Sequence, residues 1–241
     1  MRYDELLTEI QTLKAEAPAT LPADYLSAHL TRAAAESRWL RMPLYPVKDD
    51  MPVEERGARN LASAHELMLA TAAELRGGEG DNVTILIRPS HIHALHQVMM
   101  TGILPPEMCG VLRDREAAVD HFRLCFPLPE DIPHRLDNFC EQFPLLSVEP
   151  PAYEPIEAAA TVLHALLRIH PYLDGNGRVG RLLMNLVLDG HHPPVTLLSD
   201  ESSRVQYIRA LQSADRGHTT LLAALIAVAV RRAYVEMLKT T

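Results

Sequence analysis

The sequence is short of several residue types, and each shortage argues against a class of protein. Cysteine occurs three times in 241 residues, at Cys109, Cys125 and Cys140. This odd number and wide spacing, without the close pairs of metal sites, predict reduced thiols rather than a disulfide framework. Acidic residues outnumber basic ones, and the formal net charge of −8 argues against a nucleic-acid-binding surface.

Long apolar runs are also missing. The longest run late in the chain, residues 221–230, is too short to cross a bilayer and is expected to form a core helix. Residues 1–5 show no apolar signal region, so we expect a soluble protein of the cytoplasm. Glycine (11 residues) and aromatic residues (5%) are few, whereas Leu and Ala abound, which favours a mainly α fold.

Polar residues gather in one short stretch, residues 170–181, which reads HPYLDGNGRVGR. Segments with helical apolar periodicity precede it (residues 156–169) and follow it (residues 182–188). Pro171 disfavours helical angles at His170 and so ends the first helix there. The sequence therefore predicts a polar turn between two buried helices.

Two glycines and two arginines suit this turn to phosphate. Gly175 and Gly177 permit positive φ angles, so successive backbone N–H groups can surround an anion. The positive end of the following helix lies at the same place. Arg178 and Arg181, three residues apart, share one helical face and can form paired hydrogen bonds with phosphate oxygens.

A metal ligand and a base stand beside this predicted phosphate site. Asp174 is a hard oxygen ligand suited to Mg²⁺, and His170 titrates near neutral pH and can accept a proton. Together these groups indicate phosphoryl or nucleotidyl transfer. Two alternatives fail on spacing: an EF-hand loop requires glycine where Val179 stands, and a Walker loop requires Lys and then Ser or Thr after its glycines.

The whole string resembles the HPFxDGNGRxxR signature of the Fic family (Fic/Doc superfamily), with Tyr172 in place of the usual Phe. Members of this family typically transfer AMP from MgATP to a Ser, Thr or Tyr hydroxyl of a protein and release pyrophosphate. The resemblance implies that His170 is the general base on the target hydroxyl. It also implies that Asp174 binds Mg²⁺ beside the phosphates.

The same resemblance implies a set of nucleotide-binding residues: Gly175, Asn176, Gly177, Arg178, Arg181, Asn185 and Tyr207. The glycines and Asn176 would form the anion nest, and the two arginines would hold the phosphates. Asn185 either reaches the ribose or only packs in the core. Tyr207 either lies near the adenine or belongs to the core.

The chain order predicts a helical bundle with one small β-hairpin. Apolar periodicity and breaking residues predict helices over residues 3–16, 23–40, 54–75, 91–100, 156–169 and 219–238. A further helix starts at Asp131 or Pro133 and reaches Phe143, another is capped by Ser199 or Asp200 and reaches Ala214, and one follows the glycine turn through the apolar residues 182–188. Two β-prone segments around a polar tip predict a hairpin at residues 111–126. In Fic proteins a hairpin at this place, the flap, holds the target peptide as an added strand. We expect an N-terminal helical region, residues 1–45, and a Fic-like catalytic domain, residues 46–241.

Other functions and modes of regulation stay open. The scaffold could transfer another phosphate-containing group, such as phosphocholine, UMP or phosphate, or the chain could be a non-catalytic peptide-binding module. Many relatives carry an inhibitory helix whose glutamate blocks ATP binding, but here Leu40 falls at the glutamate position and Arg41 at the following glycine position. Either a separate antitoxin-like partner supplies the glutamate, or regulation differs. The expected partner is a target protein that docks on the flap, and neither nucleic acid nor membrane.

Overall fold

The computed structural model describes residues 2–36, 53–77, 84–85, 87–117, 126–146 and 155–239. The described chain is mainly helical, as predicted. It divides into two compact units, one of Met1–Arg41 with Leu188–Thr241 and one of Met42–Val187. The division into residues 1–45 and 46–241 stays a prediction. No helix within the described ranges is long and apolar enough to cross a membrane.

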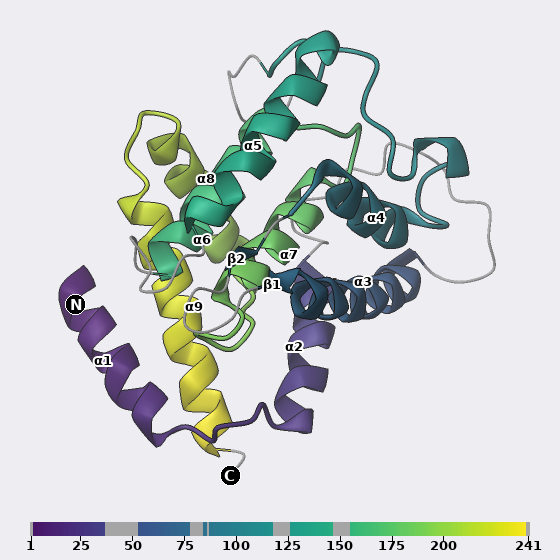
Figure 1. Ribbon diagram of the computed structural model, residues 1–241. Coiled ribbons are helices and arrows are strands. Elements are labelled where there is room, and N and C mark those ends of the chain that lie inside the picture. The colour runs from purple at the N-terminus through teal and green to yellow at the C-terminus, as the bar shows by residue number, and fades with distance from the viewer. Residues whose placement is uncertain are drawn as a thin grey trace. The chain divides into compact units, whose positions relative to one another are not determined.

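The first unit is built on α9 (Thr220–Lys239), against which α1 (Tyr3–Glu16) and α8 (Glu201–Ala214) pack (Figure 1). α9 turns a continuous series of side chains into this core at helical spacing, which is why the late apolar run forms a core helix. The series comprises Leu222, Ala223, Ile226, Ala227, Ala229, Val230, Ala233, Tyr234 and Met237.

Two polar contacts tie α2 (Ala23–Glu36) into the same unit. The buried hydroxyl of Tyr25 donates a hydrogen bond of 2.7 Å to the carbonyl of Pro194. Arg32 forms an ion pair of 2.9 Å with Glu236 of α9. α2 therefore joins the first unit through its own side chains, while the predicted continuation over residues 37–40 lies outside the described residues.

The second unit holds the predicted polar turn. Within it α3 packs on α4, α5 packs on α6, and two short strands pair antiparallel (Figure 1). Its elements are α3 (Val53–Leu75), β1 (Arg76–Gly77), β2 (Thr84–Ile85), α4 (Pro89–Met100), η2 (Pro106–Met108), η3 (Pro129–Asp131), α5 (Ile132–Leu146), α6 (Pro155–Ile169) and α7 (Asn176–Leu188).

The two helices that flank the turn are buried, as their periodicity predicts. α6 buries eight residues between Ile156 and Ile169. On α7, a Cβ added at Gly180 would lie 3.0 Å from the Leu163 Cδ1 atom, so the glycine permits close approach of the helices. α7 begins at Asn176, so its N-terminus lies at the glycine turn and Arg178 and Arg181 belong to one helix, as the sequence predicts, while the apolar period from residue 182 marks only its later turns.

Two expectations fall partly or wholly outside the described residues. Of the predicted hairpin, residues 111–117 and Phe126 are described and none of them is in a strand, while residues 118–125 lie outside. The hairpin therefore stays a prediction. Leu40 and Arg41 also lie outside the described residues, so the inhibitory register is likewise a prediction.

Candidate active site

The site begins where α6 ends. His170 has a φ angle of 49°, the left-handed conformation that costs energy in a residue with a side chain. Its backbone N–H still donates to the Leu166 carbonyl at 3.0 Å, so it closes the last turn of α6 in the way of a helix C-terminal cap. Pro171 follows and cannot continue the helix.

Arg113 fixes the backbone of this turn from a distant part of the chain. Its N–H donates to the Pro171 carbonyl at 2.9 Å, and its Nε donates to the His170 carbonyl at 2.7 Å. Sequence reasoning missed this residue. The only signal was its position at the base of the predicted hairpin.

The imidazole of His170 is kept neutral. It stacks on the Phe126 ring, with ring centroids 4.2 Å apart and an angle of 29° between the planes. Burial, and next the positive charge of Arg113, lower the pKa of His170 from its ordinary value to about 4. At neutral pH the ring therefore has a nitrogen lone pair that can accept a proton.

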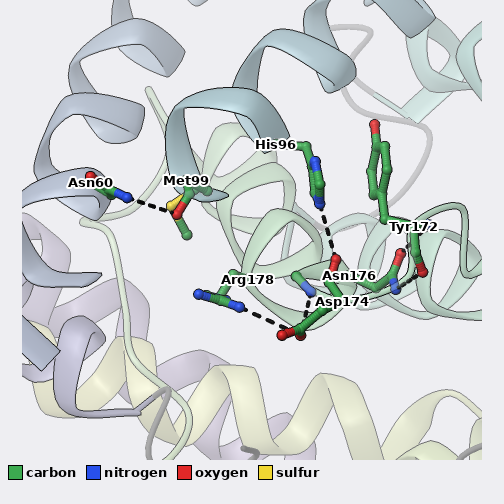
Figure 2. Close-up of polar contacts among 8 residues, drawn as sticks. Asn60, His96, Met99, Tyr172, Asp174, Asn176 and Arg178 are labelled. Carbon is green, nitrogen blue, oxygen red and sulfur yellow. Dashed lines mark hydrogen bonds and ion pairs between the residues drawn. The ribbon is translucent and has the colours of Figure 1, made fainter. Parts of the chain in front are cut away.

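Asn176 closes the turn with its side chain. Its Oδ1 accepts from the Tyr172 N–H at 2.9 Å, and its Nδ2 donates to the Tyr172 carbonyl at 2.7 Å (Figure 2). The side chain is committed to these two bonds in a residue only 3% exposed. What Asn176 can offer a ligand is its backbone N–H in the first turn of α7, where no earlier helical carbonyl accepts it.

His96 of α4 links the turn to the backbone of Gly110. Its Nδ1 accepts from the Gly110 N–H at 2.8 Å, which assigns the proton to Nε2, and Nε2 then donates to the Asp174 carbonyl at 3.0 Å (Figure 2). The His96 ring stacks on Tyr172 with centroids 3.7 Å apart. Burial lowers the pKa of His96 to about 4, so this neutral tautomer is the form present at pH 7.

Gly175 and Tyr172 fit the same surface of α4. Gly175 has a φ of +84°, and a Cβ there would lie 2.9 Å from the Met100 sulfur and 3.1 Å from the His96 Nε2 atom. Only glycine suits both the angle and the space. The Tyr172 hydroxyl, absent from the usual Phe, lies 2.8 Å from the Nδ1 atom of His93 and is satisfied there.

α3 holds α4 in place for this task. The Asn60 amide Nδ2 donates to the Met99 carbonyl at 3.1 Å (Figure 2). It also donates to the Thr101 carbonyl at 2.8 Å. These two carbonyls lie at the C-terminal end of α4, where the helix has no further backbone N–H groups to donate to them. The support thus runs from α3 through α4 to the turn, and the sequence motif alone gives no sign of it.

Charged groups gather at the start of α7. Arg178 NH2 lies 3.5 Å from Asp174 Oδ1, with the arginine side chain 11% and the aspartate side chain 26% exposed (Figure 2). Arg181 and Asn185 follow at one-turn spacing along α7 and are buried. Tyr207, the remaining predicted nucleotide contact, is buried in α8 of the first unit.

The donor set at the turn fits a substrate-bound Mg²⁺. No group of three or more His, Cys, Asp or Glu side chains that could hold a metal ion occurs among the described residues. Mg²⁺, however, is often held by one or two carboxylates together with substrate phosphates and water. Asp174, partly exposed beside the N-terminus of α7, offers such a carboxylate.

The fold is a helical one in which a glycine-rich turn joins two buried helices, and its sequence has counterparts among known proteins. Residues 86–188 match the model of the Fic/DOC family. The chain therefore carries a Fic/DOC-family domain, and the resemblance of the motif is confirmed.

Curated relatives match over part of their length. A protein adenylyltransferase Fic of Nematostella vectensis is 37% identical over 91 residues, which cover 37% of this chain and 21% of that protein. A Fido domain-containing protein of Dictyostelium discoideum is 48% identical over 64 residues, 26% of this chain and 43% of that protein. The matches thus span less than half the length of either relative.

Solved structures share the fold. A Fic domain-containing signalling protein from Bacteroides thetaiotaomicron has a TM-score of 0.74 at 16% identity, over 98% of this chain and 96% of that chain. Fic-1 from C. elegans has a TM-score of 0.70 at 19% identity, over 98% and 72%. An IbpAFic2 variant in complex with adenylylated Cdc42 has a TM-score of 0.55 at 18% identity, over 96% and 71%.

Proposed function

We propose that this protein is a protein adenylyltransferase, which transfers AMP from MgATP to a hydroxyl side chain of a target protein. The observation that carries the proposal is the placement of a neutral histidine, His170, directly before the turn that starts α7. The proposed base His170, the carboxylate of Asp174 and the N-terminus of α7 then lie within seven consecutive residues, 170–176. The two arginines follow in the first two turns of α7. The adenylyltransferase names of the relatives support the same reaction.

In this proposal each residue of the turn has a separate task. His170 takes the proton of the target hydroxyl while a bond forms between that oxygen and the α-phosphorus and the bond to pyrophosphate breaks. The N–H groups of Asn176 and Gly177 and the positive end of α7 hold the phosphates. Arg178 and Arg181 offset the charge that develops on the leaving group.

The remaining predicted residues are assigned with the same proposal. Asp174 would hold Mg²⁺, which when bound neutralises charge on the phosphates. Asn185, one turn beyond Arg181 on α7, is the proposed ribose contact, and Tyr207 the proposed adenine contact. The target protein would dock on the predicted flap, residues 111–126. Either a separate antitoxin-like protein would supply the inhibitory glutamate, or regulation would differ.

Three alternative transfer reactions would use the same contacts. The turn would bind a diphosphate and would not read the base, so transfer of UMP, phosphocholine or phosphate is chemically equivalent at this site. A labelled donor separates these reactions. We expect label from ATP carried on the α-phosphorus to enter protein, and label carried on the γ-phosphorus to stay in pyrophosphate.

The test uses the full chain with cell lysate and, separately, alone. Protein is incubated with MgATP labelled at either position, or with UTP or CDP-choline. The mass added to each modified protein is then measured by mass spectrometry. The His170→Ala variant is the control for background. Transfer of γ-label alone, or of a group other than AMP, would contradict adenylylation. No transfer of any group above the His170→Ala control would favour the peptide-binding alternative.

A further inference from the structure

Arg113 has an environment unusual for an arginine. Its residue is only 2% exposed, and its guanidinium donates to three backbone carbonyls: His170 (Nε, 2.7 Å), Arg115 (NH1, 2.8 Å) and Pro127 (NH2, 2.6 Å). Its own N–H donates to a fourth, that of Pro171, at 2.9 Å. This one residue, through its side chain and its backbone, therefore joins three stretches of chain: residues 113–115, residue 127 and residues 170–171.

Burying the guanidinium of Arg113 costs free energy, and the carbonyls around it must compensate that cost. A buried charge loses its hydration, and here that loss lowers the pKa of Arg113 from its ordinary value, although an arginine stays protonated in proteins. Carbonyl dipoles arranged in a fork are what can compensate it. The fork matches a planar guanidinium and not the compact ammonium of lysine.

The most strained residue of the site depends on this fork. His170 has its left-handed φ of 49° while its carbonyl accepts from the Arg113 Nε atom. Strained backbone of this kind persists only where surrounding contacts fix it. The Phe126 ring that stacks on His170 comes from the residue directly before Pro127, which Arg113 also holds.

We propose that Arg113 is a positioning residue, which fixes the backbone of His170 and the ring packed on it so that the imidazole meets the target hydroxyl. The assignment rests on the proposed transfer reaction for its effect on rate, and on geometry alone for its effect on His170. Arg113 itself touches neither nucleotide nor target in this role.

Two variants separate the charge of Arg113 from its geometry, and one serves as a control. Arg113→Met removes both charge and fork, Arg113→Lys keeps the charge and loses the fork, and Arg135→Met removes an exposed arginine of α5. We expect kcat to fall about 100-fold in Arg113→Met, because misplacing a catalytic group by about 1 Å lowers the rate about 100-fold. We expect a smaller fall, about 10-fold, in Arg113→Lys, which keeps the charge. KM for ATP should stay within about twofold, since the phosphate contacts lie on α7.

A second readout needs no activity. The His170 imidazole is followed by NMR, assigned with His170→Ala, and titrated in each variant. In the wild type, burial and the charge of Arg113 lower this pKa, while a hydrogen bond with the Leu167 backbone and the charge of Asp174 raise it. We expect this pKa to rise in Arg113→Met, to stay low in Arg113→Lys, and to be unchanged in Arg135→Met.

The outcomes separate this inference from the proposed function. A wild type that transfers nothing would refute the proposed function, while the NMR comparison would still test Arg113. The inference is overturned if Arg113→Met keeps the His170 pKa and signal of the wild type. It is also overturned if kcat of Arg113→Met stays within about threefold of wild type. The same holds if kcat of Arg113→Met falls only in proportion to the unfolded fraction of that variant at the assay temperature.

Discussion

The contact between α4 and the turn can be tested at His96. This residue has no exposed surface, bonds the Gly110 N–H (2.8 Å) and the Asp174 carbonyl (3.0 Å), and stacks on Tyr172 (3.7 Å). His96→Leu leaves two partly buried backbone groups without the imidazole as partner, each worth about 1–3 kcal/mol, and loses a ring pair worth about 0.5–1.5 kcal/mol. We expect the free energy of unfolding to fall by about 5 kcal/mol.

Two amide variants divide the two hydrogen bonds. In His96→Gln, the Nε2 group of the glutamine would lie near the His96 Nε2 position and keep the bond to the Asp174 carbonyl. In His96→Asn, the Oδ1 atom of the asparagine would lie near the His96 Nδ1 position and keep the bond from the Gly110 N–H. Each variant should lose about 2–3 kcal/mol of stability. Only His96→Asn should need more Mg²⁺ for transfer, because only it frees the residue proposed to hold the metal.

The assays are urea unfolding followed by circular dichroism, and AMP transfer against Mg²⁺ concentration. His134→Leu, at an exposed position on α5, is the control for loss of a histidine. The reasoning would be refuted if His96→Leu unfolded no more readily than His134→Leu. Identical Mg²⁺ curves for the two amide variants, both folded, would refute the link from His96 to Asp174.

Three further predictions concern the turn and its protonation. His170→Ala should lower transfer by about 10²–10⁴-fold with ATP affinity by calorimetry unchanged, and activity within about twofold of wild type would contradict the assignment. Asp174→Asn should raise the Mg²⁺ concentration needed for half-maximal transfer, whereas an unchanged curve would place the metal elsewhere. Stability should fall as pH drops from about 6.5 towards 4: the unfolded chain protonates first, because the folded pKa of His96 is about 4. His96 alone should cost about 2–3 kcal/mol at pH 4.5 relative to pH 7 in urea unfolding, and equal stability at the two pH values would contradict its burial as a neutral ring.

The helices that sequence predicts best are those with a continuous apolar face. The periods over residues 156–169 and 3–16 match α6 and α1 closely. α4 begins at Pro89, ahead of the predicted residue 91, because proline suits the first position of a helix and carries no apolar signal. α8 is capped by Asp200, whose side chain accepts from the Ser203 N–H, as the predicted start near residue 200 requires.

The site divides into a part that one sequence reveals and a part that it does not. Residues 170–181 are contiguous, so their chemistry can be read from the printed order. Arg113 lies 57 residues before His170, and His96 lies 78 residues before Asp174. A buried arginine and a structural histidine look like any others in a sequence, because what distinguishes them is the carbonyl or amide that folding brings to them. Sequence therefore indicates the groups that would react, and the fold shows what holds them.

The environment that keeps His170 neutral also limits its strength as a base. Burial, together with the charge of Arg113, keeps His170 neutral with a pKa of about 4. A base of that strength is available at every physiological pH but has little intrinsic pull on a hydroxyl proton. In the proposed reaction, the effect of His170 on rate would then come mainly from its placement against the hydroxyl and from the negative charge of the phosphates, which favours the protonated ring. This explains why the strained backbone of His170 and the buried Arg113, with its four hydrogen bonds, would be retained. A weak base depends on accurate placement, and these contacts fix its position.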